Sequence, residues 1–248
     1  MKRCMIFILL WPLLTPVYLY GEVGDCATKW KQITDRYSNL GPYQDLINLC
    51  GDQLRDPLRK IVLKNKRISY TNARKHIFST LDNIDGVVCS IYIDACIKTN
   101  RVPNSNVMNT EHLWPQSRGA TGIAKSDLHH LRPANSRVNS RRGNYPFCQV
   151  ETIEWEKMGS YYGKNSDNRR CFEPRDLYKG DIARAMLYFS IRYKKYIDPS
   201  QEQHFRLWHQ EDPPEKEELI RNDLIENIQK NRNPFVDIPE LVELIEDF

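Results

Sequence analysis

The sequence predicts an α+β protein, and three observations predict this class. Apolar residues recur at helical spacing in segments 43–63, 70–82 and 173–193. A β-branched and aromatic run at residues 87–93 is typical of a strand. The stretch 105–147 alternates extended and helix-compatible pieces around charged side chains. No internal repeat or low-complexity tract interrupts this pattern.

The first two helical segments differ in how clearly they begin and end. In residues 43–63 the helical spacing is interrupted near Pro57, where we expect a break. Segment 70–82 has Thr71 as a candidate N-cap and predicts a second helix. The strand expected at 87–93 follows it.

The later segments predict further helices. Residues 173–193 open with turn-forming residues and continue as an apolar helix, which places Ile182 and Phe189 on a core-facing stripe. Residues 211–248 contain two helical stretches on either side of QKNRNPFVDIPE, where Pro234 and Pro239 predict breaks.

The N-terminus has the pattern of an export signal. Lys2 and Arg3 precede an apolar run that ends near the small residue Gly21. We therefore expect residues 1–21 to be a cleaved signal peptide and residues 22–248 to form one domain. An uncleaved anchor is the alternative, which the short run and its two prolines disfavour. The protein is expected to be secreted or periplasmic, without stable membrane insertion.

The cysteine count agrees with export. Six cysteines remain after removal of the signal, an even number that suggests up to three disulfides in an oxidising compartment. Fifteen pairings are possible for six cysteines, and a bridge between Cys148 and Cys171 could close the loop after the central segment. The six positions are Cys26, Cys50, Cys89, Cys96, Cys148 and Cys171.

Composition and charge exclude several classes. A chain of 248 residues that is 40% hydrophobic and 27% charged is not disordered, and only its first residues could enter a bilayer. The total formal charge is +4, but segment 101–150 has seven Lys/Arg against Glu111 and Asp127, a local net charge of +5. Segment 211–248 has a net charge of −8. A polyanionic partner would therefore meet the centre of the chain.

The central segment also holds a candidate site. Glu111 and His112 are adjacent, so on a strand they point to opposite sides. After a Pro- and Gly-containing loop, SDLHHL alternates as a short strand would, with Asp127 and His129 on one face. A helix-compatible stretch then places Asn135 and Asn139 four residues apart. The predicted unit is strand, loop, strand, helix.

These residue types suit metal-assisted phosphodiester hydrolysis. A carboxylate and an amide oxygen are donors that suit Mg²⁺. A neutral histidine beside them could take a proton from water, and arginines could hold a phosphate through paired hydrogen bonds. A zinc site of His112, His129 and His130 is conceivable, but it would leave the asparagines and arginines unexplained.

The pattern EH…SDLHHLRP…VNSRRGN resembles the endonuclease I family of secreted nucleases, which carry the His-Me (ββα-metal) finger. The segments EPRDLYKGDIARAMLYFSIRY, LWHQEDPPEKEELIRN and QKNRNPFVDIPELVE extend the resemblance over roughly residues 40–245. It implies a mostly helical mixed fold around a finger core at 105–147, one Mg²⁺ ion, and cleavage of DNA and often RNA with little sequence preference.

Carried over by position, the resemblance assigns roles to the motif residues. His112 would be the general base and Glu111 a Mg²⁺ ligand. Asn139 would be the second ligand, with Asn135 and Asn144 as alternatives. Arg118 or Arg142 would stabilise the transition state.

The flanking residues of the motif receive supporting roles. Arg132, Arg137 and Arg141 would contact backbone phosphates. Asp127 and His129 would support the site from behind by accepting or donating hydrogen bonds.

The sequence thus predicts a monomeric, Mg²⁺-dependent endonuclease that cleaves DNA, and RNA as well, to give 5′-phosphate ends. One alternative is an exported ribonuclease. Another is a non-catalytic nucleic-acid-binding protein with the same fold. The joint presence of Glu111, His112 and Asn139 argues against the second alternative, because binding alone needs no base.

Overall fold

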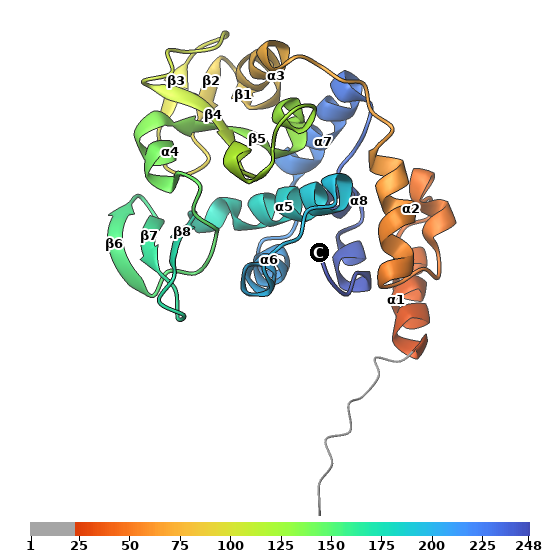
Figure 1. Ribbon diagram of the computed structural model, residues 1–248. Coiled ribbons are helices and arrows are strands. Elements are labelled where there is room, and N and C mark those ends of the chain that lie inside the picture. The colour runs from red at the N-terminus through yellow and green to blue at the C-terminus, as the bar shows by residue number, and fades with distance from the viewer. Residues whose placement is uncertain (1–22) are drawn as a thin grey trace, which may run out of the picture.

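The computed structural model describes residues 23–248, in which helices combine with small antiparallel sheets (Figure 1). This arrangement confirms the α+β class. The expected signal peptide lies outside the described residues. No helix of the described part is long and apolar enough to cross a membrane.

The α-helices are α1 (Val23–Arg36), α2 (Asp52–Val62), α3 (Tyr70–His76), α4 (Ser136–Arg142), α5 (Lys179–Tyr193), α6 (Pro199–Glu211), α7 (Lys216–Gln229) and α8 (Pro234–Asp237). The strands are β1 (Asn83–Ile84), β2 (Val87–Cys89), β3 (Cys96–Lys98), β4 (Met108–His112), β5 (Leu131–Asn135), β6 (Thr152–Lys157), β7 (Ser160–Lys164) and β8 (Arg170–Glu173). Short segments of 3₁₀ or π helix are η1 (Gly41–Leu46), η2 (Ile77–Leu81), η3 (Gln116–Arg118), η4 (Ala124–Ser126), η5 (Leu128–His130), η6 (Asp176–Tyr178) and η7 (Pro239–Leu244).

Helix α5 lies at the centre of the molecule. In Figure 1 it runs between α1 and α2 on one side and the strands on the other, with α6 below it. It packs against α2, α6, α8 and η5. Ile182 and Phe189 are buried as the apolar stripe predicts, but every residue from Ile182 to Arg192 is buried as well. The helix is therefore enclosed on all sides and not on one face only.

The unit β4–loop–β5–α4 has the predicted order of strand, loop, strand and helix, but its second strand is Leu131–Asn135 and not the predicted SDLHHL. Strands β4 and β5 pair antiparallel, with Glu111 opposite Arg132 and His112 opposite Leu131. Helix α4 begins directly after β5, where the Asn135 side chain accepts hydrogen bonds from the backbone N–H groups of Arg137 and Val138. This N-cap turns the chain from the strand into the helix. A second hydrophobic cluster, which includes Met108 and Leu131, packs on the hairpin.

Two expected elements in the first half differ from the structure. The break in segment 43–63 lies at Gly51, which has φ +54°, and Pro57 lies inside α2. The cap of α3 is Ser69 and not Thr71, because the Ser69 hydroxyl accepts from the Asn72 N–H. The predicted helix over 70–82 is otherwise confirmed as α3 followed by η2.

Two expected strands are shorter or absent. Only Val87–Cys89 of segment 87–93 forms a strand, because the chain then turns back to β3. SDLHHL does not form the predicted strand. Its Leu128–His130 is a 3₁₀ turn whose start is capped by the Asp127 carboxylate, which accepts from the His129 N–H at 3.1 Å.

The sheet β6–β7–β8 was not predicted from the sequence. It lies beside α4 in Figure 1 and forms an antiparallel meander. The described chain contains three disulfides, Cys26–Cys50, Cys89–Cys96 and Cys148–Cys171. The last one is the pairing suggested by the sequence, and it joins the chain after α4 to β8.

Candidate active site

The carboxylate of Glu111 lies in the interior, on strand β4. Glu111 is 3% exposed. Its Oε1 accepts a 2.7 Å hydrogen bond from the Tyr92 hydroxyl and lies 3.0 Å from a guanidinium nitrogen of Arg142. Both of these contacts fall on Oε1, which orients the carboxylate and leaves Oε2 free of them.

Asn139 extends this cluster from helix α4. Its Nδ2 donates to Oδ1 of Asn109 at 2.7 Å, and its amide also hydrogen-bonds the Glu111 carboxylate. Burial raises the pKa of Glu111 above its ordinary value, whereas Arg142, Tyr92 and Asn139 act to lower it. An amide side chain thus lies against a carboxylate, and amide and carboxylate oxygens are donors that suit Mg²⁺.

The structure separates the three candidate asparagines. Asn135 uses its side-chain oxygen as the N-cap of α4, so that oxygen is already occupied. Asn144 lies beyond the helix and donates to the Ser117 hydroxyl at 3.2 Å. Asn139 is the one that contacts Glu111. The geometry therefore supports Asn139 over the other two.

The ring of His112 has its two nitrogens in different environments. Nε2 lies 3.0 Å from the carbonyl oxygen of Lys125, which can only accept, so Nε2 must carry the proton. Nδ1 then holds a lone pair, and the amide nitrogen of Gln116 lies 3.5 Å from it. Burial, and next the neighbouring His130, lower the pKa of His112 to about 3. The ring is therefore neutral at physiological pH and able to accept a proton at Nδ1.

His129 and His130 have interior roles. Nε2 of His129 lies 3.2 Å from the Asn231 carbonyl, and Nε2 of His130 lies 2.7 Å from the Ala124 carbonyl. The His130 ring is 5.5 Å from that of His112. Burial lowers the pKa of both histidines to about 4. In the described chain no three His, Cys, Asp or Glu side chains form a metal-binding group, so the zinc alternative is not supported.

Asp127 joins the turn η5 to α5 and α7. Its carboxylate accepts from the hydroxyls of Tyr188 and Tyr193 and from the amide of Gln229, at 3.0, 2.8 and 2.8 Å. Burial alone would raise the pKa of Asp127, but Arg192, the neighbouring His129 and His130 and the Gln229 amide hold it below its ordinary range. Asp127 and His129 thus support the polypeptide behind the hairpin, and their contacts are with the core.

The two candidate transition-state arginines are placed differently. Arg142 is 2% exposed and donates to the carbonyls of His112 and Leu113, in addition to its ion pair with Glu111. This position makes it a partner of Glu111. Arg118 lies on the exposed turn η3, where its Nε donates to the Asn144 carbonyl at 2.9 Å. Because this hydrogen bond uses only Nε and the side chain is exposed, the other guanidinium nitrogens of Arg118 can meet a phosphate. Arg118 is therefore better placed for this contact than Arg142.

The expected phosphate contact of Arg132 is not supported by its environment. Arg132 is 7% exposed and its guanidinium pairs with Asp82 at 3.2 Å and Asp181 at 2.6 Å. Its single positive charge is neutralised inside the protein by these two carboxylates, so its role is structural. Arg137 and Arg141 are exposed on α4. Arg141 lies over the rings of Trp155 and Tyr162.

Sequence reasoning missed Tyr92, Gln116 and Asn109. Tyr92 lies in the short loop between β2 and β3, 19 positions before its partner Glu111. Gln116 is four positions after His112, a spacing that could have drawn attention to it. Asn109 and Glu111 are two positions apart on β4 and therefore share a face, which was a usable signal.

Comparison with known proteins identifies the family. The family profile described as Endonuclease I matches residues 50–240, a region that includes the whole β4–β5–α4 unit. The chain belongs to the endonuclease I family. The resemblance inferred from the sequence motifs is thereby confirmed, and the family is one of nucleases.

Individual proteins similar to this chain are also nucleases by name. An extracellular ribonuclease of Bacillus subtilis is 33% identical over 86% of this chain and 78% of its own length. An extracellular ribonuclease of Bacillus amyloliquefaciens is 32% identical over 82% of this chain and 77% of its own. A periplasmic deoxyribonuclease of Aeromonas hydrophila is 32% identical, over 46% of this chain and 48% of its own length.

Proposed function

We propose that this protein is an exported, Mg²⁺-dependent endonuclease that hydrolyses phosphodiester bonds of RNA and DNA with little sequence preference. The single observation that carries the proposal is the pairing of two features on the unit β4–β5–α4. The Asn139 side chain hydrogen-bonds the Glu111 carboxylate, which brings an amide and a carboxylate together, and His112 presents an unprotonated Nδ1. The unit is proposed to be a ββα-metal finger.

The donor chemistry supports a divalent ion at Glu111 and Asn139. Oε2 of Glu111 and Oδ1 of Asn139 would hold it, because Oε1 already has protein partners. Bound Mg²⁺ would supply positive charge to the phosphate and to the leaving 3′-oxygen as negative charge develops there. Arg142 partly neutralises Glu111, and the retained waters of Mg²⁺ suit a site with few protein ligands.

The residues of the chain would share the remaining work. His112 takes a proton from water at Nδ1, while the Lys125 carbonyl stabilises the protonated ring through Nε2. The negative charge of bound substrate would raise the low pKa of His112 toward the working range. Arg118 on its exposed turn would approach the phosphate. In-line attack of the deprotonated water on phosphorus breaks the P–O3′ bond, and the leaving 3′-oxygen takes a proton from solvent water, which gives 5′-phosphate and 3′-hydroxyl ends.

RNA is proposed as a substrate on equal terms with DNA. The relatives named ribonucleases match 86% and 82% of this chain, whereas the relative named periplasmic deoxyribonuclease matches 46%. The names of these relatives place them outside the cell or in the periplasm, and the three disulfides here fit export to an oxidising compartment.

The test compares purified, oxidised protein with its His112→Ala variant on plasmid DNA and on single-stranded RNA, in Mg²⁺ or in EDTA. We expect Mg²⁺-dependent cleavage at many positions and a loss of about 10²–10⁴ in rate in the variant. A variant of near-full activity would exclude His112 as the base. Salt-sensitive binding without any turnover would identify a binding protein that keeps the fold.

A further inference from the structure

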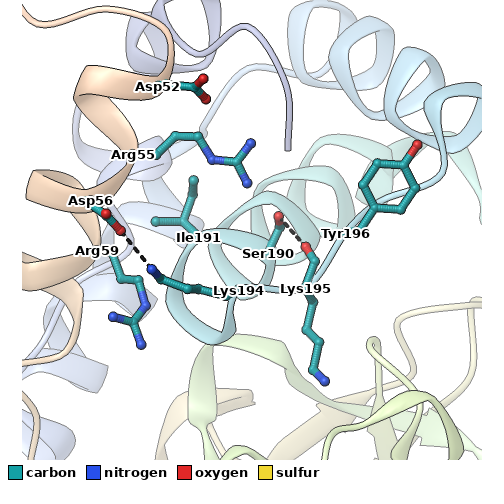
Figure 2. A pocket seen from close by; sticks show the side chains of 9 residues that line it. All are labelled: Asp52, Arg55, Asp56, Arg59, Ser190, Ile191, Lys194, Lys195 and Tyr196. Atoms are coloured by element: carbon teal, nitrogen blue, oxygen red, sulfur yellow. Dashed lines mark hydrogen bonds and ion pairs between the residues drawn. The ribbon is translucent and has the colours of Figure 1, made fainter.

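A charged recess lies between α2 and the C-terminal end of α5 (Figure 2). Its volume is about 400 Å³. Four basic side chains line it, namely Arg55, Arg59, Lys194 and Lys195, together with the acidic Asp52 and Asp56. We call this the α2–α5 recess. None of its lining residues belongs to the candidate active site.

The positive charge of the α2–α5 recess is only partly neutralised. Lys194 pairs with Asp56 at 3.1 Å, as Figure 2 shows. Nε of Arg59 donates to the carbonyl of Arg192 at 3.2 Å, a contact that does not cancel its charge. Within residues 23–248, neither Arg59 nor Lys195 forms a salt bridge. Asp56 also feels the charge of Arg59, but four basic side chains against two acidic ones leave the recess a net charge of +2 for an anionic ligand.

The recess is adjacent to the turn that contacts the candidate base. Gly119, which ends the turn η3, has φ +110°, and a Cβ built on it would lie 2.9 Å from Nζ of Lys195. The missing side chain thus lets the Lys195 ammonium approach this turn. Gln116, at the other end of the turn, lies 3.5 Å from Nδ1 of His112. One short turn therefore separates Lys195 from the candidate base.

An aromatic ring borders the same recess. Tyr196 lines it and is 70% exposed. The chain at this point is held by the Ser190 hydroxyl, which donates to the Lys195 carbonyl at 2.6 Å (Figure 2). Cations that follow a phosphate backbone, combined with an exposed aromatic ring, are the features by which proteins bind single strands. In a duplex the bases are already stacked and unavailable to such a ring.

We propose that the α2–α5 recess binds an unpaired nucleic-acid strand on one side of the cleaved bond. Arg59 and Lys195 contact backbone phosphates, and Tyr196 stacks on an unpaired base. The inference deepens the proposed nuclease function and rests on it for the position of the cleaved bond. It gives the enzyme a preference for single-stranded substrates long enough to reach from His112 to Tyr196.

The test measures binding and cleavage separately. Fluorescent single-stranded oligonucleotides of about 4 and about 16 nucleotides span the range of single-strand site sizes. Affinity is measured in EDTA as a function of salt, and kcat and KM in Mg²⁺. The variants are Arg59→Gln with Lys195→Gln, Lys195→Gln alone, and Tyr196→Ala. Lys60→Gln is the matched control, because Lys60 is exposed on α2 but does not line the recess.

For the long oligonucleotide, the double variant should bind about 5- to 10-fold more weakly. Its slope of log affinity against log salt concentration should be smaller by about 1.4, because each of the two lost phosphate contacts contributes ~0.7. Tyr196→Ala should weaken the long strand but not a duplex of equal length. The short substrate and Lys60→Gln should be unaffected. Thermal unfolding verifies that the variants fold, and Lys195→Gln alone avoids removing the Arg59 contact to α5.

Equal losses on short and long substrates, or an equal effect of Lys60→Gln, would overturn the proposal. So would equal affinity of the wild-type protein for both lengths in EDTA. If the protein binds the long strand through these residues but cleaves nothing, the recess stands and the proposed catalytic function fails.

Discussion

Tyr92 and Glu111 are joined by a 2.7 Å hydrogen bond in the protein interior, from the phenol hydroxyl to Oε1 of the carboxylate. Burial raises the pKa of Tyr92 well above its ordinary value, so the phenol remains a donor. The bond connects the β2–β3 loop to the strand that carries the candidate metal ligand and base. The orientation of Glu111 therefore depends on a loop outside the motif.

Tyr92→Phe should lower the affinity for Mg²⁺ and the cleavage rate by about 10- to 100-fold, because a carboxylate ligand loses the group that orients it. Activity titrated with Mg²⁺ measures this change. Tyr43→Phe is the matched control, since the Tyr43 hydroxyl donates to Asp237 at 2.6 Å in another part of the core. If both variants lost activity equally, the effect would come from general destabilisation and not from Glu111.

The disulfides should differ in what their removal affects. Cys89–Cys96 spans 7 positions and closes the loop of Tyr92, whereas Cys26–Cys50 spans 24. Chain entropy assigns about 2.5 kcal/mol to the short loop and about 3.5 kcal/mol to the long one. The double serine variant at Cys89 and Cys96 should therefore lose more activity, and the one at Cys26 and Cys50 more stability. Urea unfolding measures the stability of both variants, and Mg²⁺-dependent cleavage measures their activity. The opposite ranking of the two variants in either measurement would contradict the prediction.

The central unit could be predicted from sequence because its signals are local. Asn135 stands where a helix N-cap belongs, and Glu111 and His112 precede a Pro- and Gly-containing loop. The sheet β6–β7–β8 was missed although Ile153 and Trp155 alternate with Glu154 and Glu156 in β6, which was a usable strand signal. In the structure Trp155 is half-buried and the other β6 residues are exposed, so this strand contributes little to the core.

Long-range partners explain most of the remaining errors. Arg132 in the sequence looks like any other basic residue of a basic segment. Its partners Asp82 and Asp181 lie 50 and 49 positions away, and only the fold shows that they neutralise it. SDLHHL alternates like a strand, but the capping bond from Asp127 and the interior contacts of both histidines favour a 3₁₀ turn. Tertiary contacts override local preference here.

The buried histidines should make the protein unstable in acid. His209 is 6% exposed, its Nε2 lies 3.0 Å from the Pro239 carbonyl, and burial lowers its pKa to about 4. In the unfolded chain histidine has a pKa of about 6.5. The unfolded state thus binds more protons as the pH falls, so the stabilisation is complete above pH 6.5 and is lost toward pH 4.

Replacing His209 with Gln should remove the decrease in the free energy of unfolding that His209 causes in acid, about 3 kcal/mol between pH 7 and pH 4. The free energy of unfolding in urea, measured at several pH values for both proteins, tests this. The two curves should converge as the pH falls. Parallel curves would show that His209 titrates equally in the folded and unfolded states.

Replacing Asn135 should mainly lower stability, whereas replacing Asn139 should mainly weaken metal binding, although both residues belong to the same short segment. Asn135→Ala removes the N-cap of α4 and should cost about 1 kcal/mol of stability while Mg²⁺ affinity is largely kept. Asn139→Ala leaves the cap in place but removes the amide beside Glu111. It should lower Mg²⁺-dependent cleavage by at least tenfold with a smaller effect on unfolding. The reverse pattern would assign the metal ligand to Asn135. The side-chain oxygen of Asn135 would then have to leave the backbone N–H groups of α4 when the metal binds.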